Sequence, residues 1–173
     1  MPRPVQTHPM ALLDVAREYA DAASELLEIA AARPRTRGRP MPLSRPIYFL
    51  FSHAAELAFK AFLRAKNAPV GKVHDLTVFY EVCRNLGLVI GPDDRTDIGN
   101  VVSLLDSGNK QQGFRYFELQ TTTIPELSWT RDTVRELIQV IEPHILSADV
   151  PGPTGAQITL TLSKPVKKAQ SGS

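Results

Sequence analysis

The sequence predicts an all-α protein folded as one bundle of about five helices. Apolar residues recur three and four residues apart in five separate stretches, which is the period of an amphipathic helix. Segments rich in proline, glycine or polar residues separate these stretches. The length of 173 residues and the hydrophobic content of 43% suit a single domain with a hydrophobic core.

A first helix is expected from Met10 to about Ala32, after a flexible lead-in over residues 1–9. Its apolar residues fall at heptad-like positions, namely Leu12, Val15, Tyr19, Ala22, Leu26 and Ile29. Its acidic residues form the solvent-facing side, namely Asp14, Glu18, Asp21, Glu25 and Glu28. The apolar spacing favours packing within a bundle or against a partner helix.

The loop over residues 33–46 ends this helix with four prolines and one glycine, and it carries five arginines. An interleaved run of Arg and Pro is typical of a solvated connector. The alternative is an arm that contacts phosphate, because a guanidinium group offers a rigid fork of hydrogen-bond donors. The loop has no aromatic side chain for stacking on a base. Both interpretations stay open.

The central helix is predicted from Ser44, its expected N-cap, to about Lys66. It is apolar over most of its circumference, and such a helix is usually buried. One narrow polar stripe interrupts it, formed by His53, Glu56, Lys60, Arg64 and Asn67. Charges on a buried helix need partners, so we expect Glu56 to pair with Lys60, with Asp75 or Arg115 as further partners. The stripe is either a structural polar network or a ligand-facing site.

Three shorter helices complete the predicted bundle. His74-Asp75-Leu76 opens the first of them, with Asp75 as its cap and Gly87 as its stop. The next is expected from about Asp93 to Ser107 and stops at Gly108. Residues 109–128 are expected to be extended or irregular. The last helix is predicted from about Trp129 to Glu142, where Pro143 ends or kinks it.

The C-terminal segment 148–173 is expected to be a flexible tail. Within it GAQITLTLSK alternates like a β-strand, which leaves an added edge strand as the alternative. The helical domain itself is predicted over residues 10–147.

Composition limits the function classes. The net charge of +2 argues neither for nor against a nucleic-acid partner, so any basic patch must be local. The single cysteine, Cys83, excludes an intrachain disulfide and is expected to be a buried structural thiol. The four scattered histidines and one cysteine argue against a metal site, and no glycine-rich phosphate loop or cofactor motif occurs. No stretch is long enough for a membrane span, so we expect a cytoplasmic protein.

Three segments occur in an order that resembles the HEPN domain family (higher eukaryote and prokaryote nucleotide-binding). They are HAAELAFKAFLRAKN at 53–67, GKVHDLTVFYEVCRNLGL at 71–88, and FRYF at 114–117 before the last helix. The resemblance covers roughly residues 10–146. It implies an up-and-down helical bundle, often a homodimer, in a family of nucleotide- and RNA-binding proteins, ribonucleases, toxins and partners of nucleotidyltransferases.

The nuclease signature of that family, an Arg followed by four to six residues and a His, is missing from the expected place. Arg3 and His8 have the spacing but lie in the N-terminal lead-in. His53, His74 and His144 have no Arg at the required distance. We therefore expect a nucleotide- or RNA-binding module. The alternatives are a metal-independent ribonuclease with a non-standard site, and an antitoxin-like or other protein-interaction subunit.

The candidate ligand-binding residues are His53, Glu56, Lys60, His74, Asp75, Arg115 and Tyr116. In this hypothesis Lys60 and Arg115 neutralise phosphate, and His74 donates a hydrogen bond. Glu56 and Asp75 orient the cations. Tyr116 beside Arg115 either holds a phosphate or a base face, or ties its loop to the bundle. A ribonuclease would use His53 or His74 together with Arg115.

Overall fold

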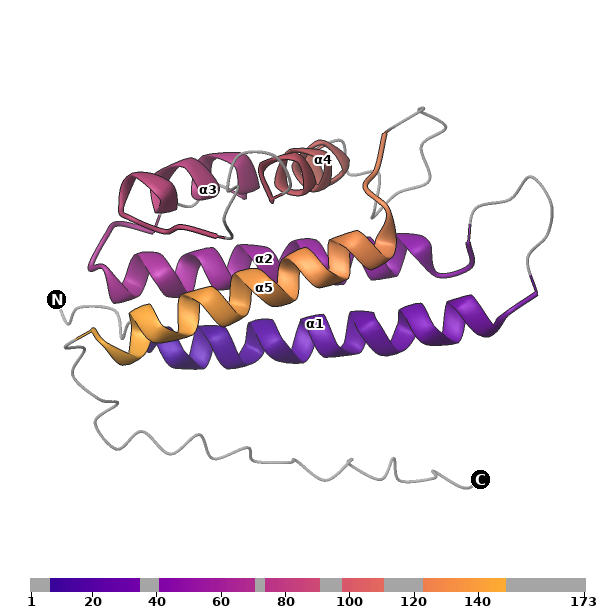
Figure 1. The fold of residues 1–173 in the computed structure, drawn as a ribbon, viewed down its shortest axis with the longest axis horizontal. Helices are drawn as coiled ribbons and strands as arrows, with labels where there is room; N and C mark the ends of the chain where they lie inside the picture. The colour runs from indigo at the N-terminus through magenta and orange to yellow at the C-terminus, as the bar shows by residue number, and fades with distance from the viewer. Residues whose placement is uncertain (1–6, 35–40, 71–73, 91–97, 111–122, 149–173) are drawn as a thin grey trace, which may run out of the picture.

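The computed structural model describes residues 7–34, 41–70, 74–90, 98–110 and 123–148, and the side chains of 108–110 are not described. Five α-helices lie in these ranges (Figure 1): α1 Pro9–Ala32, α2 Ser44–Ala65, α3 Leu76–Asn85, α4 Ile98–Lys110 and α5 Leu127–Leu146. The described part contains no strand. The prediction of an all-α bundle of about five helices is confirmed.

Helix α2 is the centre of the bundle and packs against all four other helices. In Figure 1, α1 and α5 lie along one side of α2, and the shorter α3 and α4 lie along the other. Three phenylalanines of α2 are fully buried, namely Phe51, Phe59 and Phe62. The predicted burial of this helix is therefore confirmed. None of the described helices is long and apolar enough to cross a membrane.

Helix α1 turns a different face to the core from the one its large side chains predict. The buried residues are Leu13, Ala16, Ala20, Ala23, Leu27 and Ala30. The predicted stripe beginning at Leu12 and Val15 lies beside this face, partly or largely exposed. The buried alanines of α1 pack on a helix that buries Ala54, Ala58 and Ala61. Small side chains let two helices approach closely, so alanine, and not the large residues, marks this contact.

The start of α2 and the end of α4 differ from the prediction. Ser44 is the first helical residue, and the N-cap is Leu43, whose φ of 65° turns the chain while its side chain packs against the core. Helix α4 continues past Gly108 to Lys110, and its predicted start at Asp93 lies outside the described residues. Gly87, with φ of 89°, follows α3 as predicted, in the left-handed region that glycine tolerates.

Helix α5 extends beyond the predicted range at both ends. Glu126 caps its start by accepting a hydrogen bond from the backbone N–H of Trp129 at 2.9 Å. Pro143 lies inside the helix, which continues to Leu146. A proline removes one backbone donor, but buried Ile145 anchors the last turn in the core. The Tyr48 hydroxyl donates to the carbonyl of Pro125 and so ties α2 to the segment before α5.

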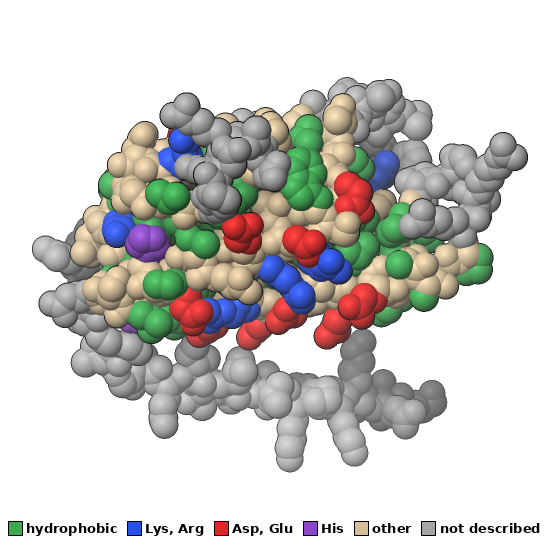
Figure 2. Space-filling view, viewed as in Figure 1, with side chains coloured by type: hydrophobic (Ala, Val, Ile, Leu, Met, Phe, Trp, Pro, Cys, Tyr) green, Lys and Arg blue, Asp and Glu red, His purple; other side chains and the backbone are tan. Residues whose placement is uncertain are grey.

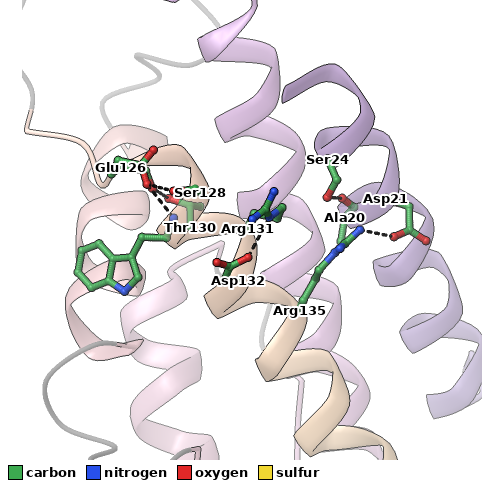
Figure 3. A network of polar contacts seen from close by, with 10 residues as sticks. Ala20, Asp21, Ser24, Glu126, Ser128, Thr130, Arg131, Asp132 and Arg135 are labelled. Atoms are coloured by element: carbon green, nitrogen blue, oxygen red, sulfur yellow. Dashed lines mark hydrogen bonds and ion pairs between the residues drawn. The ribbon is translucent and has the colours of Figure 1, made fainter. Parts of the chain in front are cut away.

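Ion pairs join α5 to α1 on the solvent side. Arg17 lies 2.7 Å from Glu142, and Arg135 lies 3.3 Å from Asp21. Figure 3 shows Arg135 reaching from α5 toward Asp21, with the Glu126 cap at the start of the same helix. Figure 2 shows acidic and basic side chains side by side on this face. Exposed pairs of this kind contribute about 0–1 kcal/mol each, so the apolar core supplies most of the α1–α5 attachment.

The alanine-lined contact of α1 predicts opposite outcomes for two neighbouring substitutions. Ala23→Leu adds volume to a fully buried site and is expected to lower the free energy of unfolding by about 1–3 kcal/mol. Ala22→Leu places the same side chain on an exposed position and is expected to change it by about 0.5 kcal/mol or less. Urea unfolding followed by circular dichroism measures both. Equal destabilisation by the two substitutions would contradict the described register of α1.

Candidate functional site

Glu56 is a carboxylate buried in the middle of the central helix, with 4% of its surface exposed. Its Oε1 lies 2.5 Å from Nζ of Lys60, one turn along α2. The same oxygen lies 2.8 Å from Nδ1 of His74, just before α3. The predicted pairing of Glu56 with Lys60 is therefore present, and His74 is the second partner in place of Asp75.

The electrostatics of Glu56 favour the ionised form. Burial alone would raise the pKa of this carboxyl, because a charged group loses its hydration. Hydrogen bonds from Lys60 and His74, together with their charges, outweigh burial and hold the pKa of Glu56 below its ordinary value. The cluster thus contains a stable buried anion whose two partners come from different parts of the chain.

His74 is held at one nitrogen and open at the other. An ionised carboxylate only accepts hydrogen bonds, so Nδ1 of His74 carries the proton that points to Glu56. Within the described residues Nε2 has no hydrogen-bond partner, and the side chain is 72% exposed. In its neutral form, an imidazole oriented in this way presents a lone pair to solvent, which is the arrangement that a general base or a hydrogen-bond acceptor needs, and in its protonated form Nε2 is a donor.

Lys60 bridges the buried and exposed parts of the cluster. Its ammonium group pairs with Glu56 and lies 5.6 Å from the ring centre of Phe79 on α3. A cation over an aromatic face is attracted by the ring quadrupole. Helix α3 is therefore attached to this part of α2 through both the carboxylate and the lysine.

Two aspartates fix the start of α3. Asp75 accepts from the backbone N–H of Val78 at 3.0 Å, which confirms its predicted role as a cap. Asp106 of α4, only 3% exposed, accepts from the backbone N–H of Leu76 at 2.9 Å and from the Thr77 hydroxyl at 3.1 Å. The backbone N–H groups of Leu76 and Val78 are thus both paired with carboxylates. Asp75 therefore acts as a structural cap.

Sequence reasoning missed Asp106, although a signal was present. It follows Leu105 and lies four residues after Val102, both of which are buried. An acidic residue on the apolar face of a helix needs a buried donor, and the backbone at the start of α3 supplies it. Its place in the predicted α4 range could have identified it as the link between α3 and α4.

His53 does not join the Glu56 cluster. Its ring stands edge-on to Tyr19 of α1, with ring centres 4.6 Å apart, and lies parallel to Phe49 at 6.2 Å. The partners of Glu56 in the described part are Lys60 and His74. His53 is therefore part of the α1–α2 contact, and its predicted place in the ligand site is not supported by this geometry.

The polar stripe of α2 continues past Lys60 to an open cavity of about 500 Å³. The cavity lies at the end of α2 and is lined by Arg64, Asn67, Ala68, Pro69 and Val70. Nε of Arg64 is buried and has no hydrogen-bond partner among the described residues. A buried donor without an acceptor is uncommon and costs free energy. The structure thus adds Arg64 and Asn67 to the candidate residues.

Some sequence predictions fall outside this geometry. Arg115 and Tyr116 lie outside the described residues, as do residues 35–40 of the arginine-rich loop and residues 149–173 of the predicted tail.

Cys83 is buried, as predicted, and burial raises the pKa of its thiol to about 12. A thiol this weakly acidic is a poor nucleophile. The described residues bring no three His, Cys, Asp or Glu side chains together in a way that could hold a metal ion.

Comparison of the chain with models of protein families, with curated proteins and with solved structures found no match.

The buried carboxylate predicts a pH-dependent stability. Because the folded pKa of Glu56 is below its ordinary value of 4.5, ionised Glu56 stabilises the fold above about pH 4.5, and this contribution is lost as the pH falls through the folded pKa. Glu56→Gln is expected to lower the unfolding free energy at pH 7 by about 1–3 kcal/mol. The difference in unfolding free energy between the wild type and Glu56→Gln should become smaller below pH 4.5.

Urea unfolding at several pH values measures this difference. Glu25→Gln is the control, because Glu25 is exposed and has no ion pair in the described part of the chain. A difference between wild type and Glu56→Gln that stays constant from neutral to acidic pH would show that the carboxylate charge does not stabilise the fold.

Proposed function

We propose that the chain is a HEPN-like module that binds a nucleotide or RNA. The proposed binding surface consists of Lys60, Arg64, Asn67 and His74, at the end of α2 and the start of α3. The observation that carries the proposal is that Arg64 and Asn67, which follow Lys60 on the same polar stripe, line an open cavity. Because Nε of Arg64 is buried, the terminal nitrogens of the guanidinium are the donors that would bind the anionic oxygens of a ligand there.

Phosphate is the ligand group that these donors suit best. A guanidinium binds phosphate through two parallel hydrogen bonds, and an ammonium binds it as a point charge. Lys60 and Arg64 are neighbours one turn apart on α2, and the Asn67 side chain adds an amide that can donate to a phosphate or to a base edge. The volume of about 500 Å³ is within the range of small-molecule sites.

Glu56 acts behind this surface. It is buried and its bonds to Lys60 and His74 fix the positions of both partners. These bonds support the proposal that Glu56 orients Lys60 and His74. The homodimer and the contributions of Arg115 and Tyr116, which the family resemblance implies, stay predictions.

One feature favours a metal-independent ribonuclease as the second candidate. His74 has its Nδ1 proton directed to Glu56, which leaves Nε2 able to accept a proton from a ribose 2′-hydroxyl. Arg64 and Lys60 would stabilise the charge that develops on the phosphate. In this case His74 is the catalytic base and Glu56 is a positioning residue.

Binding is tested with a short fluorescein-labelled RNA in EDTA, with fluorescence anisotropy as the readout. We expect the wild type to bind with a strong dependence on salt, because binding to phosphate releases counterions. Arg64→Gln should weaken binding and reduce the slope of log K against log salt by about 0.7, the value for one phosphate on a single strand. Unfolding curves of the variant verify that it remains folded.

The matched control is Arg131→Gln. Arg131 lies near the start of α5, and Figure 1 shows that the start of α5 and the end of α2 lie at opposite ends of the bundle. This substitution removes the same charge and should leave the slope unchanged. Absence of RNA binding by the wild type, or equal effects of the two substitutions, would contradict the proposed surface.

The same RNA, analysed on a gel, distinguishes the two candidates. Cleavage in EDTA that is lost in His74→Ala, with RNA binding retained, would identify the ribonuclease. Binding without cleavage in both proteins would identify the binding module.

A further inference from the structure

A second feature is the apolar stripe of α1 that lies beside its core face and that the core covers only in part. It consists of Leu12, Val15, Tyr19, Ala22, Leu26 and Ile29. Val15 is 39% exposed and Ile29 is 49% exposed. The spacing alternates between three and four residues over most of the helix, which is the pattern of the a and d positions of a coiled coil. Such a stripe on a helix that already has a core face suits a second helix.

The stripe reaches α2 along one of its edges. The Tyr19 ring contacts His53 on α2, and Phe49 lies one turn before His53. Leu50 and Leu57 of α2 are also only partly buried. A helix lying on the stripe would therefore touch side chains of both α1 and α2.

Two carboxylates border the other edge. Glu18 is three residues from Val15 and four from Ala22, so it adjoins both on the helix surface. Glu25 adjoins Ala22 and Ile29 in the same way. Both are exposed and form no ion pair with the described residues, whereas Asp14 and Asp21 pair with arginines of the same chain. The stripe is thus bordered by two carboxylates whose charges no described residue neutralises.

A second copy of α1 does not complement this edge. In the coiled-coil pattern Glu18 and Glu25 occupy g positions, and Ala16, Ala23 and Ala30 occupy e positions. An antiparallel pair of α1 helices would place g opposite g and so set carboxylates against each other. A parallel pair would place g opposite e, where buried alanines offer no positive charge. Neither arrangement neutralises the two glutamates.

We infer that the outer face of α1 binds an amphipathic helix of another protein, with apolar residues at heptad spacing and Lys or Arg along the edge that meets Glu18 and Glu25. The apolar stripe supplies the contact area, and the charges select the partner. This surface is independent of the proposed nucleotide site. The full chain could then bring a partner protein to its ligand.

The test uses two labelled helical peptides with identical leucine heptads, one flanked by lysines and the other by glutamates. Anisotropy with the full chain is expected to show binding of the lysine peptide, and binding of the glutamate peptide that is at least about tenfold weaker. The double variant Val15→Ser/Ile29→Ser should lose binding of the lysine peptide, because it removes exposed apolar contacts and spares the core.

Charge reversal gives the sharper control. Glu25→Lys should weaken the lysine peptide and strengthen the glutamate peptide, whereas Glu136→Lys on α5 makes the same charge change at an exposed residue of another helix and should alter neither. Equal binding of the two peptides, equal effects of the two substitutions, or no binding by a monomeric wild type would overturn the inference. A wild-type dimer in sedimentation that Val15→Ser/Ile29→Ser dissociates would also overturn it, by identifying a second copy as the occupant.

Discussion

The buried carboxylate of Glu56 is the constraint on which the arrangement of α2 and α3 depends. An ionised group enclosed in a core needs partners, because an unpaired buried charge is strongly destabilising. Lys60 comes from the same helix, but His74 must be brought from the segment that precedes α3. The pairing therefore fixes where the chain returns to α2. Asp75 and Asp106 then hold the first turn of α3, and Asp106 also attaches α4.

The same constraint determines what the end of α2 presents to solvent. Lys60 and His74 form hydrogen bonds with the buried Glu56. Arg64 and Asn67 continue the polar stripe into an open cavity. A rigid buried anion that orients exposed donors is a common way to prepare a binding surface, because the donors lose little conformational freedom when a ligand arrives. The stability of the α2–α3 contact and the proposed recognition of phosphate thus have one physical origin.

The α1–α2 contact follows a different rule. Alanines on both helices allow a close approach, and the core covers the larger residues of the neighbouring stripe of α1 only in part. A helix with two apolar faces, one rich in alanine and one lined by larger residues, can serve the core and a partner together. The residues that the core covers only in part carry the inferred docking surface.

Helix number, helix type and the central position of α2 could be predicted from the sequence, because apolar residues recur with the helical period in every helix. The core face of α1 could not, since the prediction weighted large side chains and a close contact selects small ones. Of the two predicted effects of Pro143, ending α5 is wrong, because the helix continues to Leu146 and buried Ile145 packs in the core beyond the proline.

In the candidate site, the Glu56–Lys60 pair follows directly from their spacing, and the cap by Asp75 follows from residue type. His74 as the partner of Glu56 depends on long-range packing between residues 18 positions apart. His53 lies on the same stripe, so the sequence predicts it in the site. Helical periodicity predicts the face on which a residue lies, but not which residues of other elements contact it. The unsatisfied Nε of Arg64 is a feature of the folded chain that no sequence pattern encodes.

The tautomer of His74 tests the central claim most directly. In ¹⁵N NMR spectra of the imidazole ring at a pH where it is neutral, the account predicts that wild-type His74 carries its proton on Nδ1, because Glu56 accepts it. Glu56→Gln should weaken this preference, because a neutral amide is a poorer acceptor. A wild-type His74 protonated on Nε2, with the same spectrum in Glu56→Gln, would show that the carboxylate does not orient the imidazole and would contradict the account.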